Sequence, residues 1–407
     1  MSSLAQRREN LHRSRRLLVF IGAVAFSSSG SGLSVVAVNY YLYVRTHAAL
    51  SVGLAVLVTF VPPAVVIPAL QPLFHQGRLK QLSYLIPLAQ AGTTLLLALW
   101  TSRDGAVWGI YGFLTLLGCL VQLSWIATYS LLPHLRGLVP PVRANAWLHG
   151  ASQWGVISAM LAASLIGKIA PPLLIFYDAL TFLGIAAAML WCTRDLKTEA
   201  LVAQEQGQSS AKGRFRRVLR EIAGSRPIAA ASWFIAALPL GYVTILIINT
   251  ALPVLTLRER LLGPRNYTLA EFAFALGAVL TSGLLSQEKM QERRLLVPSL
   301  LVLAGGVSAL GISTQLFALL PTMVLLGGAV LAVNTSAQNL AQRLVSAPLL
   351  PTAQSLGSLV GTAVGAAMVL ITAFLLQSGW LLAGLLAIAC CILLIASQVR
   401  RKVEVLV

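Results

Sequence analysis

The sequence predicts an all-α, polytopic membrane protein with twelve transmembrane helices. Of the 407 residues, 57% are hydrophobic and only 10% are charged, and the mean hydropathy is +0.81. A soluble domain of this length would expose far more Asp, Glu, Lys and Arg, because its surface must face water. The apolar residues also fall into runs of about 20, the length at which a helix crosses a hydrocarbon core roughly 30 Å thick.

Twelve such runs follow one another along the chain. The first comes after a basic N-terminal segment and, at about 27 residues, is longer than the core of a cleaved signal peptide, which predicts a retained first helix. One long polar break, rich in Gln, Ser and Arg, follows the sixth run. The predicted spans are 17–43, 50–73, 82–100, 106–131, 146–169, 173–192, 228–251, 267–286, 295–313, 315–340, 352–376 and 380–397.

The polar break divides the chain into an N-terminal six-helix bundle (1–192), a cytoplasmic linker (193–227) and a C-terminal six-helix bundle (228–407). The two bundles look like weak copies of each other. Leu116-Leu117-Gly118 in the fourth span matches Leu325-Leu326-Gly327 in the tenth, about half a chain length later. Two similar bundles joined by a flexible linker are typical of a carrier whose halves rock about a central site.

The net charge of +18 is explained by topology rather than by nucleic-acid binding, because the basic residues lie between the apolar runs. With both termini inside, the cytoplasmic segments collect 24 of the 30 Lys and Arg residues. The positive-inside rule therefore predicts a multi-pass membrane protein with cytoplasmic termini. The six basic residues left outside are Arg45, Arg103, Lys168, Arg258, Arg260 and Arg265.

No motif of an enzyme is found. The four cysteines lie in apolar runs without metal-ligand spacing, and there is no phosphate-binding Gly-x-x-x-x-Gly-Lys segment, no His-Glu-x-x-His and no convincing Ser-His-Asp set. We therefore expect no catalytic residues, no metal and no cofactor. Without a nucleotide site, the source of energy for transport would be an ion gradient.

Short motifs spread over the chain resemble the major facilitator superfamily, and within it the bacterial branch that includes the enterobactin exporter. They are Gly32-Leu-Ser-Val-Val-Ala-Val-Asn39, Ala48-Ala-Leu-Ser-Val-Gly53, Ala144-Asn-Ala146 and Phe176-Tyr-Asp-Ala-Leu-Thr-Phe182. The resemblance covers nearly the whole chain. It implies a cavity lined by spans 1, 4, 7 and 10, and a siderophore as the first expectation for the exported substrate.

The sequence departs from that branch at two places. Ser29-Gly30-Ser31-Gly32 stands near the middle of the first span, where the branch usually has an acidic residue. In the loop after the second span, His75 stands where the family has a gating aspartate, with Arg78 and Lys80 following in the same gating loop. The second departure questions the usual charge pairing at the inner gate and, with it, any coupling scheme taken from relatives.

Polar and aromatic stripes on the four cavity spans are the predicted substrate site. Such side chains are costly against lipid and usually face the interior of a bundle. Hydrogen bonding between helices is the alternative explanation. The predicted cavity residues are Asn39 and Tyr43 on span 1, Gln122, Trp125 and Tyr129 on span 4, Asn249 on span 7, and Asn334 and Gln338 on span 10.

Only two of the twelve acidic residues, Asp178 and Glu271, fall inside apolar runs, each about a turn from the outer end of its span. A charge there is costly unless it is paired, so each is a candidate proton carrier. Two structural explanations stay open. Asp178 could pair with Lys168 across the turn before its span, and Glu271 could be a first-turn acid that interacts with the helix dipole.

Small residues line one face of two spans and predict close helix packing. The face on span 5 includes Gly150, Gly155, Ser158, Ala159 and Ala162, and Gly357, Gly361 and Gly365 recur every four residues on span 11.

Together these observations predict a gradient-driven secondary transporter, a proton-coupled exporter of a small polar or amphiphilic molecule. A multidrug efflux pump is the first alternative. A lipid flippase, which should show an apolar cavity half with a lateral opening, and a non-transporting receptor are the others. The expected partners are a small-molecule substrate, protons and membrane lipids, with no nucleic acid, and the expected state is a monomer.

Overall fold

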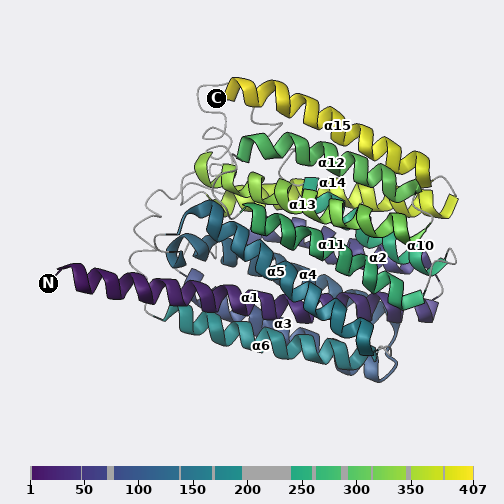
Figure 1. Cartoon of the computed structure of the whole chain (residues 1–407). Coiled ribbons are helices and arrows are strands. Elements are labelled where there is room, and N and C mark those ends of the chain that lie inside the picture. Colours follow the sequence, from purple (N-terminus) through teal and green to yellow (C-terminus); the bar gives the residue numbers. More distant parts are fainter. Residues whose placement is uncertain are drawn as a thin grey trace.

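The computed structural model describes residues 2–46, 48–70, 78–136, 139–166, 170–194, 240–258, 263–285, 292–312, 315–344, 350–378 and 381–406. Within these ranges, all regular secondary structure is helical, and twelve helices run along roughly one axis (Figure 1). The N- and C-termini lie at the same end of the bundle, here called the termini end. The all-α polytopic fold predicted from the sequence is confirmed.

The helices follow the predicted spans in order. The first six are α1 (Ser2–Thr46), α2 (Ala49–Leu70), α3 (Leu79–Ser102), α4 (Val107–Leu135), α5 (Pro141–Ile166) and α6 (Pro171–Thr193). The second six are α10 (Leu240–Arg258), α11 (Gly263–Leu285), α12 (Glu292–Ile312), α13 (Leu316–Leu344), α14 (Leu350–Ser378) and α15 (Leu381–Leu406). Most of the predicted linker and the start of the seventh span lie outside the described residues, so the domain boundaries stay a prediction.

The length and composition of six described helices, α1, α3, α4, α6, α11 and α13, are sufficient to cross a membrane. The others contain shorter apolar stretches, such as Leu50–Pro63 in α2 and Val243–Leu252 in α10. Large apolar side chains are exposed along the outside of the bundle, and on α6 they include Leu173, Leu180 and Leu190. Such a surface fits hydrocarbon rather than water, in agreement with a multi-pass membrane protein.

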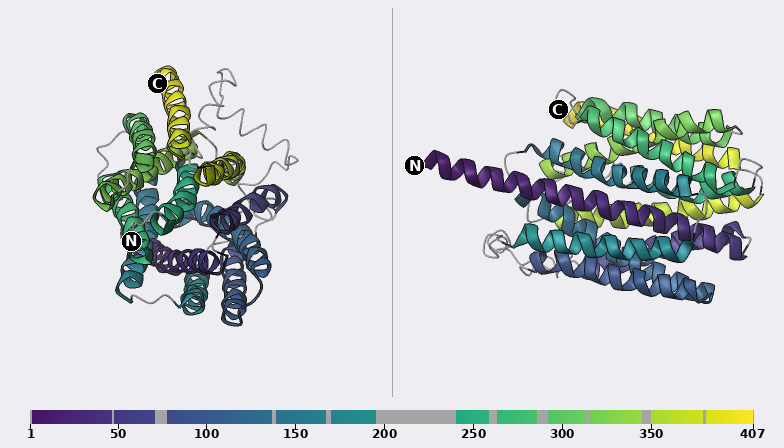
Figure 2. Two further views of the ribbon diagram at one scale, coloured as in Figure 1. Left: turned by 90° about the vertical axis from the view of Figure 1, so that its right-hand side faces the viewer. Right: turned by 60° about the horizontal axis from the view of Figure 1, so that its bottom comes forward.

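The helices pack in two groups whose internal contacts largely match (Figure 2). The exception among the described helices is α1, which also packs on α6, a contact without a comparable counterpart between α10 and α15. In the N half, formed by α1–α6, α1 packs on α5, α2 on α4, and α3 on α4 and α6. In the C half, formed by α10–α15, the same places are taken by α10 on α14, α11 on α13, and α12 on α13 and α15. The halves meet where α5 packs on α11 and α2 packs on α14.

Two glycines show that the internal repeat is real. A Cβ atom at Gly118 of α4 would overlap the carbonyl oxygen of Thr59 in α2, and a Cβ at Gly327 of α13 would overlap the carbonyl oxygen of Phe274 in α11. In each half, therefore, the fourth helix approaches the second so closely that only glycine fits. The equivalence predicted from Leu116-Leu117-Gly118 and Leu325-Leu326-Gly327 is confirmed by equivalent contacts.

Candidate functional site

A carboxylate is buried where α1 crosses α6. A Cβ at Gly30 of α1 would overlap the side chains of Thr181 and Asp178 in α6, so the two helices are in direct contact at this level. Asp178 is only 4% exposed. It lies seven residues, or about two turns, inside α6, deeper than the single turn expected from the apolar run.

The hydrogen-bond partners of Asp178 are neutral hydroxyl groups. Ser31 donates to its Oδ1 at 3.2 Å, and Thr181 donates to the same oxygen at 3.4 Å and to the Asp178 carbonyl oxygen at 2.8 Å. The third hydroxyl partner of Asp178 is Ser34, which like Ser31 belongs to α1. No cation contacts Asp178 within the described part of the chain, and Lys168, the predicted partner, lies outside it. The serine-rich segment of α1 thus supplies hydroxyl donors to an acid of α6.

Glu271 lies eight residues inside α11, more than two turns from Gly263. Its interpretation as a first-turn acid is therefore wrong. Its Oε1 atom is buried and has no hydrogen-bond partner among the described residues. Tyr267, one turn earlier, is buried within hydrogen-bonding reach of Asn39 on α1. Glu271 thus lies beside a polar contact between the two halves.

The aromatic stripe on α4 packs inside the N half. The rings of Trp125 and Tyr129 stack with centroids 5.5 Å apart, and the Tyr129 hydroxyl lies 3.2 Å from Nε2 of His149 on α5. Tyr129 belongs to the apolar core of this half, and Trp125 packs against that core. The alternative explanation, hydrogen bonding between helices, applies to Tyr129. The role of this stripe and of the half-buried Gln122 in binding substrate stays a prediction.

The other predicted cavity residues are divided between both halves. Asn39 is buried and Tyr43 half-buried on α1, while Asn249 is half-buried on α10. Asn334 of α13 packs against the backbone of α10, because a Cβ at Gly241 would overlap its side-chain oxygen. The side chain of Gln338 lies outside the described part of the structure.

The predicted gating loop is described only from Arg78 onward, and His75 lies outside the described residues. Arg78 precedes the first turn of α3 and is exposed. The Lys80 ammonium group donates to the carbonyl oxygen of Arg194, at the end of α6, at 2.7 Å. This bond joins two helices of the N half and does not reach the C half.

The clearest polar contacts between the halves were not predicted from the sequence. Asn145 Nδ2 donates to Asn339 Oδ1 at 2.9 Å, and the two side chains are 0% and 2% exposed. Nearby, Ser282 of α11 donates to the carbonyl oxygen of Ala146 at 2.7 Å. These residues lie in the first turns of α5 and in the last turns of α11 and α13, so the contacts join the halves near the termini end. We call the first one the Asn145–Asn339 contact.

The predicted close packing is observed at three glycines of the small-residue faces, whereas Ser158 and Ala162 of the same α5 face are exposed. A Cβ at Gly150 of α5 would overlap the Ser282 hydroxyl of α11, and one at Gly155 would overlap the carbonyl oxygen of Ala25 in α1. On α14, a Cβ at Gly365 would overlap Leu246 of α10. Close approach between helices therefore occurs both within the halves and between them.

No protein-family model matches the chain, and no curated protein matches it. Several solved structures are similar to this chain over nearly their whole length. A bacterial homologue of the iron transporter ferroportin, in an outward-facing state, superposes with a TM-score of 0.71 at 15% identity over 96% of this chain and 99% of that one. The nucleoside transporter NupG gives 0.63 at 15% identity, with the same coverage.

The fucose:proton symporter FucP of E. coli, in its N162A form, gives 0.61 at 12% identity over 95% of this chain and 98% of that one. At such identities the likeness concerns the fold alone, and the named substrates differ in chemistry. The chain therefore has the twelve-helix fold of major facilitator superfamily transporters.

Proposed function

We propose that the chain is a gradient-driven secondary transporter whose two halves rock about a substrate site between them. The fold and the repeated packing of the halves support this proposal. The Asn145–Asn339 and Ser282–Ala146 contacts are the kind of polar contact that has to break when halves separate.

The single observation that carries the proposal is Asp178. A carboxylate that is 4% exposed within a membrane-spanning helix is costly to keep charged, and its hydroxyl donors reduce that cost without cancelling it. A carboxyl group that takes up and releases a proton at this position is what a proton carrier needs. Glu271 is the second candidate carrier, in the other half.

The proposed direction is export in exchange for protons, and the proposed substrate is a small polar or amphiphilic molecule. A siderophore is the first substrate class, because of the resemblance to siderophore exporters, and multidrug efflux is the alternative. A lipid flippase is a further alternative; one apolar pocket of the described region lies within the N half, between α5 and α6. We place the protein in the cell inner membrane as a monomer with cytoplasmic termini, without cofactor, metal or nucleic acid.

The test is a flux assay with the full-length protein in proteoliposomes. A proton gradient is imposed across the vesicle membrane, and uptake of a catecholate siderophore is compared with uptake of a lipophilic cation. We expect the siderophore flux to follow the gradient and to disappear when a protonophore dissipates it. A gradient-driven flux of the cation alone would favour multidrug efflux. If neither flux responds, proton exchange is refuted for both substrate classes.

A further inference from the structure

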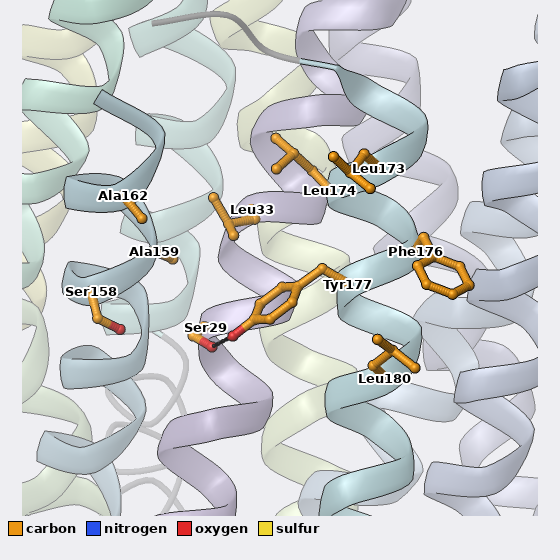
Figure 3. Close-up of a pocket in the computed structure, with 10 residues that line it drawn as sticks. All are labelled: Ser29, Leu33, Ser158, Ala159, Ala162, Leu173, Leu174, Phe176, Tyr177 and Leu180. Atoms are coloured by element: carbon orange, nitrogen blue, oxygen red, sulfur yellow. Dashed lines mark hydrogen bonds between the residues drawn. The ribbon is translucent and has the colours of Figure 1, made fainter. Parts of the chain in front are cut away.

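A pocket of about 590 Å³ lies between α5 and α6, with α1 as its floor (Figure 3). Its volume is in the range of sites that hold small organic molecules. Ten residues line it: Ser29, Leu33, Ser158, Ala159, Ala162, Leu173, Leu174, Phe176, Tyr177 and Leu180. None of them carries a charge, and none is among the predicted cavity residues.

The mouth of the pocket opens toward lipid. Leu173, Phe176 and Leu180 lie at its α6 side and are 65%, 42% and 46% exposed. On the α5 side, Ser158 and Ala162 are also exposed. Because both helices belong to the bundle expected to span the membrane, exposed apolar side chains at this mouth fit contact with lipid rather than water.

The hydroxyl groups of the pocket share one property: each donates its proton in a hydrogen bond within the protein. Ser29 donates its proton to the carbonyl oxygen of Phe26 at 2.7 Å. In the 3.1 Å bond between Ser29 and Tyr177, the Tyr177 hydroxyl must therefore be the donor. Ser158 donates to the carbonyl oxygen of Gly155 at 2.8 Å. Because each hydroxyl group already donates its one proton, it can offer a ligand only the lone pairs of its oxygen as acceptors.

A pocket with apolar walls and oxygen acceptors selects a ligand that brings its own donor. A carboxylate or an ether has no proton to give, and a charged amine would enter without a counter-charge among the lining residues. We propose that this pocket binds an uncharged amphiphile of the bilayer, a long apolar chain ending in a hydroxyl group that donates to Tyr177.

The probe is hexadecanol with a photoreactive diazirine in its chain, added to proteoliposomes that contain the full-length protein. After illumination, labelled peptides are identified by mass spectrometry. We expect labelling on α5 and α6 around Ala162 and Leu173. Unlabelled hexadecanol should compete more strongly than hexadecyl methyl ether or palmitate, by about three- to tenfold, the effect of one hydrogen bond.

Three variants test the location of the bound probe. Ala162→Phe should fill the pocket and remove the labelling. Ala187→Phe places the same ring on an exposed, lipid-facing position of α6 away from the pocket, so it should leave labelling unchanged. Tyr177→Phe keeps the ring but lacks the acceptor, and should abolish the preference for the alcohol over the ether while labelling persists. Gel filtration of each variant verifies that it is folded.

The proposal is overturned if Ala162→Phe labels like Ala187→Phe, or if the ether competes as well as the alcohol against the unsubstituted protein. It does not depend on transport, so a failed flux assay leaves it standing, and its own failure leaves the transporter proposal unaffected.

Discussion

The two halves share one packing scheme but hold their buried acids in different surroundings. Gly118 meets the backbone of α2 just as Gly327 meets the backbone of α11. Asp178, in the N half, has hydroxyl donors from Ser31 and Thr181. The Oε1 atom of Glu271, in the C half, has no such donor among the described residues.

This difference shows that the two halves share backbone contacts but not the polar groups around their acids. Backbone contact between the second and fourth helices sets the shape of each half, and it is the same in both. The polar groups are not repeated, so the chemistry of coupling need not be symmetric. Variants at the equivalent glycines should therefore act alike, and variants at the two acids should not.

The largest effect is expected at Asp178. Asp178→Asn keeps the size of the side chain and its bonds to Ser31 and Thr181 but cannot bind and release a proton. Gradient-driven flux in proteoliposomes should fall to the level of empty vesicles, while downhill exchange of substrate persists. Asp104→Asn, at an exposed acid that pairs with Arg45 in the turn between α3 and α4, is the control for the loss of an acid outside the buried site and should transport normally. If Asp178→Asn still shows gradient-driven flux, coupling does not depend on Asp178, and the proposed difference between the two buried acids is refuted.

The glycine contacts should respond equally in both halves. Gly118→Ala and Gly327→Ala each introduce a methyl group against a backbone carbonyl, which should destabilise the fold by about 1–3 kcal/mol. Gly112→Ala and Gly305→Ala, on the α4 and α12 faces where nothing lies within 4 Å, should be neutral or slightly stabilising. Thermal unfolding in detergent, followed by tryptophan fluorescence, measures all four. A clear effect in only one half would contradict the equivalence.

The Asn145–Asn339 contact should control how readily the halves separate at the termini end. Asn339→Ala removes one buried hydrogen bond, which should shift the population toward the separated state by about two- to tenfold. Spin labels at the exposed residues Gln81 and Ser397, one in each half, report the distance. Thr94→Ala, a buried change within α3 of the N half, is the control. An unchanged distance distribution in Asn339→Ala would show that other contacts hold the halves together.

The smallest effect is expected at Glu271. Glu271→Gln removes a potential charge at an atom without hydrogen-bond partners in the described region, so we expect gradient-driven flux within about twofold of the unsubstituted protein. The same flux assay measures it beside Asp178→Asn. Loss of flux in Glu271→Gln together with normal flux in Asp178→Asn would transfer the coupling role to the C half.

The sequence predicts the helices well because the length of an apolar run is a direct consequence of bilayer thickness. It predicts the internal repeat because a glycine in contact with a backbone tolerates no other residue. The depth of the acids is less predictable. Helices α6 and α11 begin at Pro171 and Gly263, before their predicted spans start at 173 and 267, so Asp178 lies about half a turn and Glu271 about one turn deeper than the apolar runs suggest.

Contacts between distant residues are not predictable from local patterns. Asn145 lies before the apolar run of its span, and nothing nearby in the sequence indicates that Asn339 faces it. The partner of Tyr129 is His149, a residue that the sequence alone gives no reason to select. Both pairs depend on the rotation of one helix against another, which is set by the packing of the whole bundle.

The Asn145–Asn339 contact joins two neutral amides, and this has a consequence for the conditions under which the protein can work. Dissolved ions screen charge pairs but have little effect on a buried bond between uncharged groups. A transmembrane voltage likewise exerts no net force on a group without charge. The Asn145–Asn339 contact itself should therefore be about as strong in dilute as in saline media.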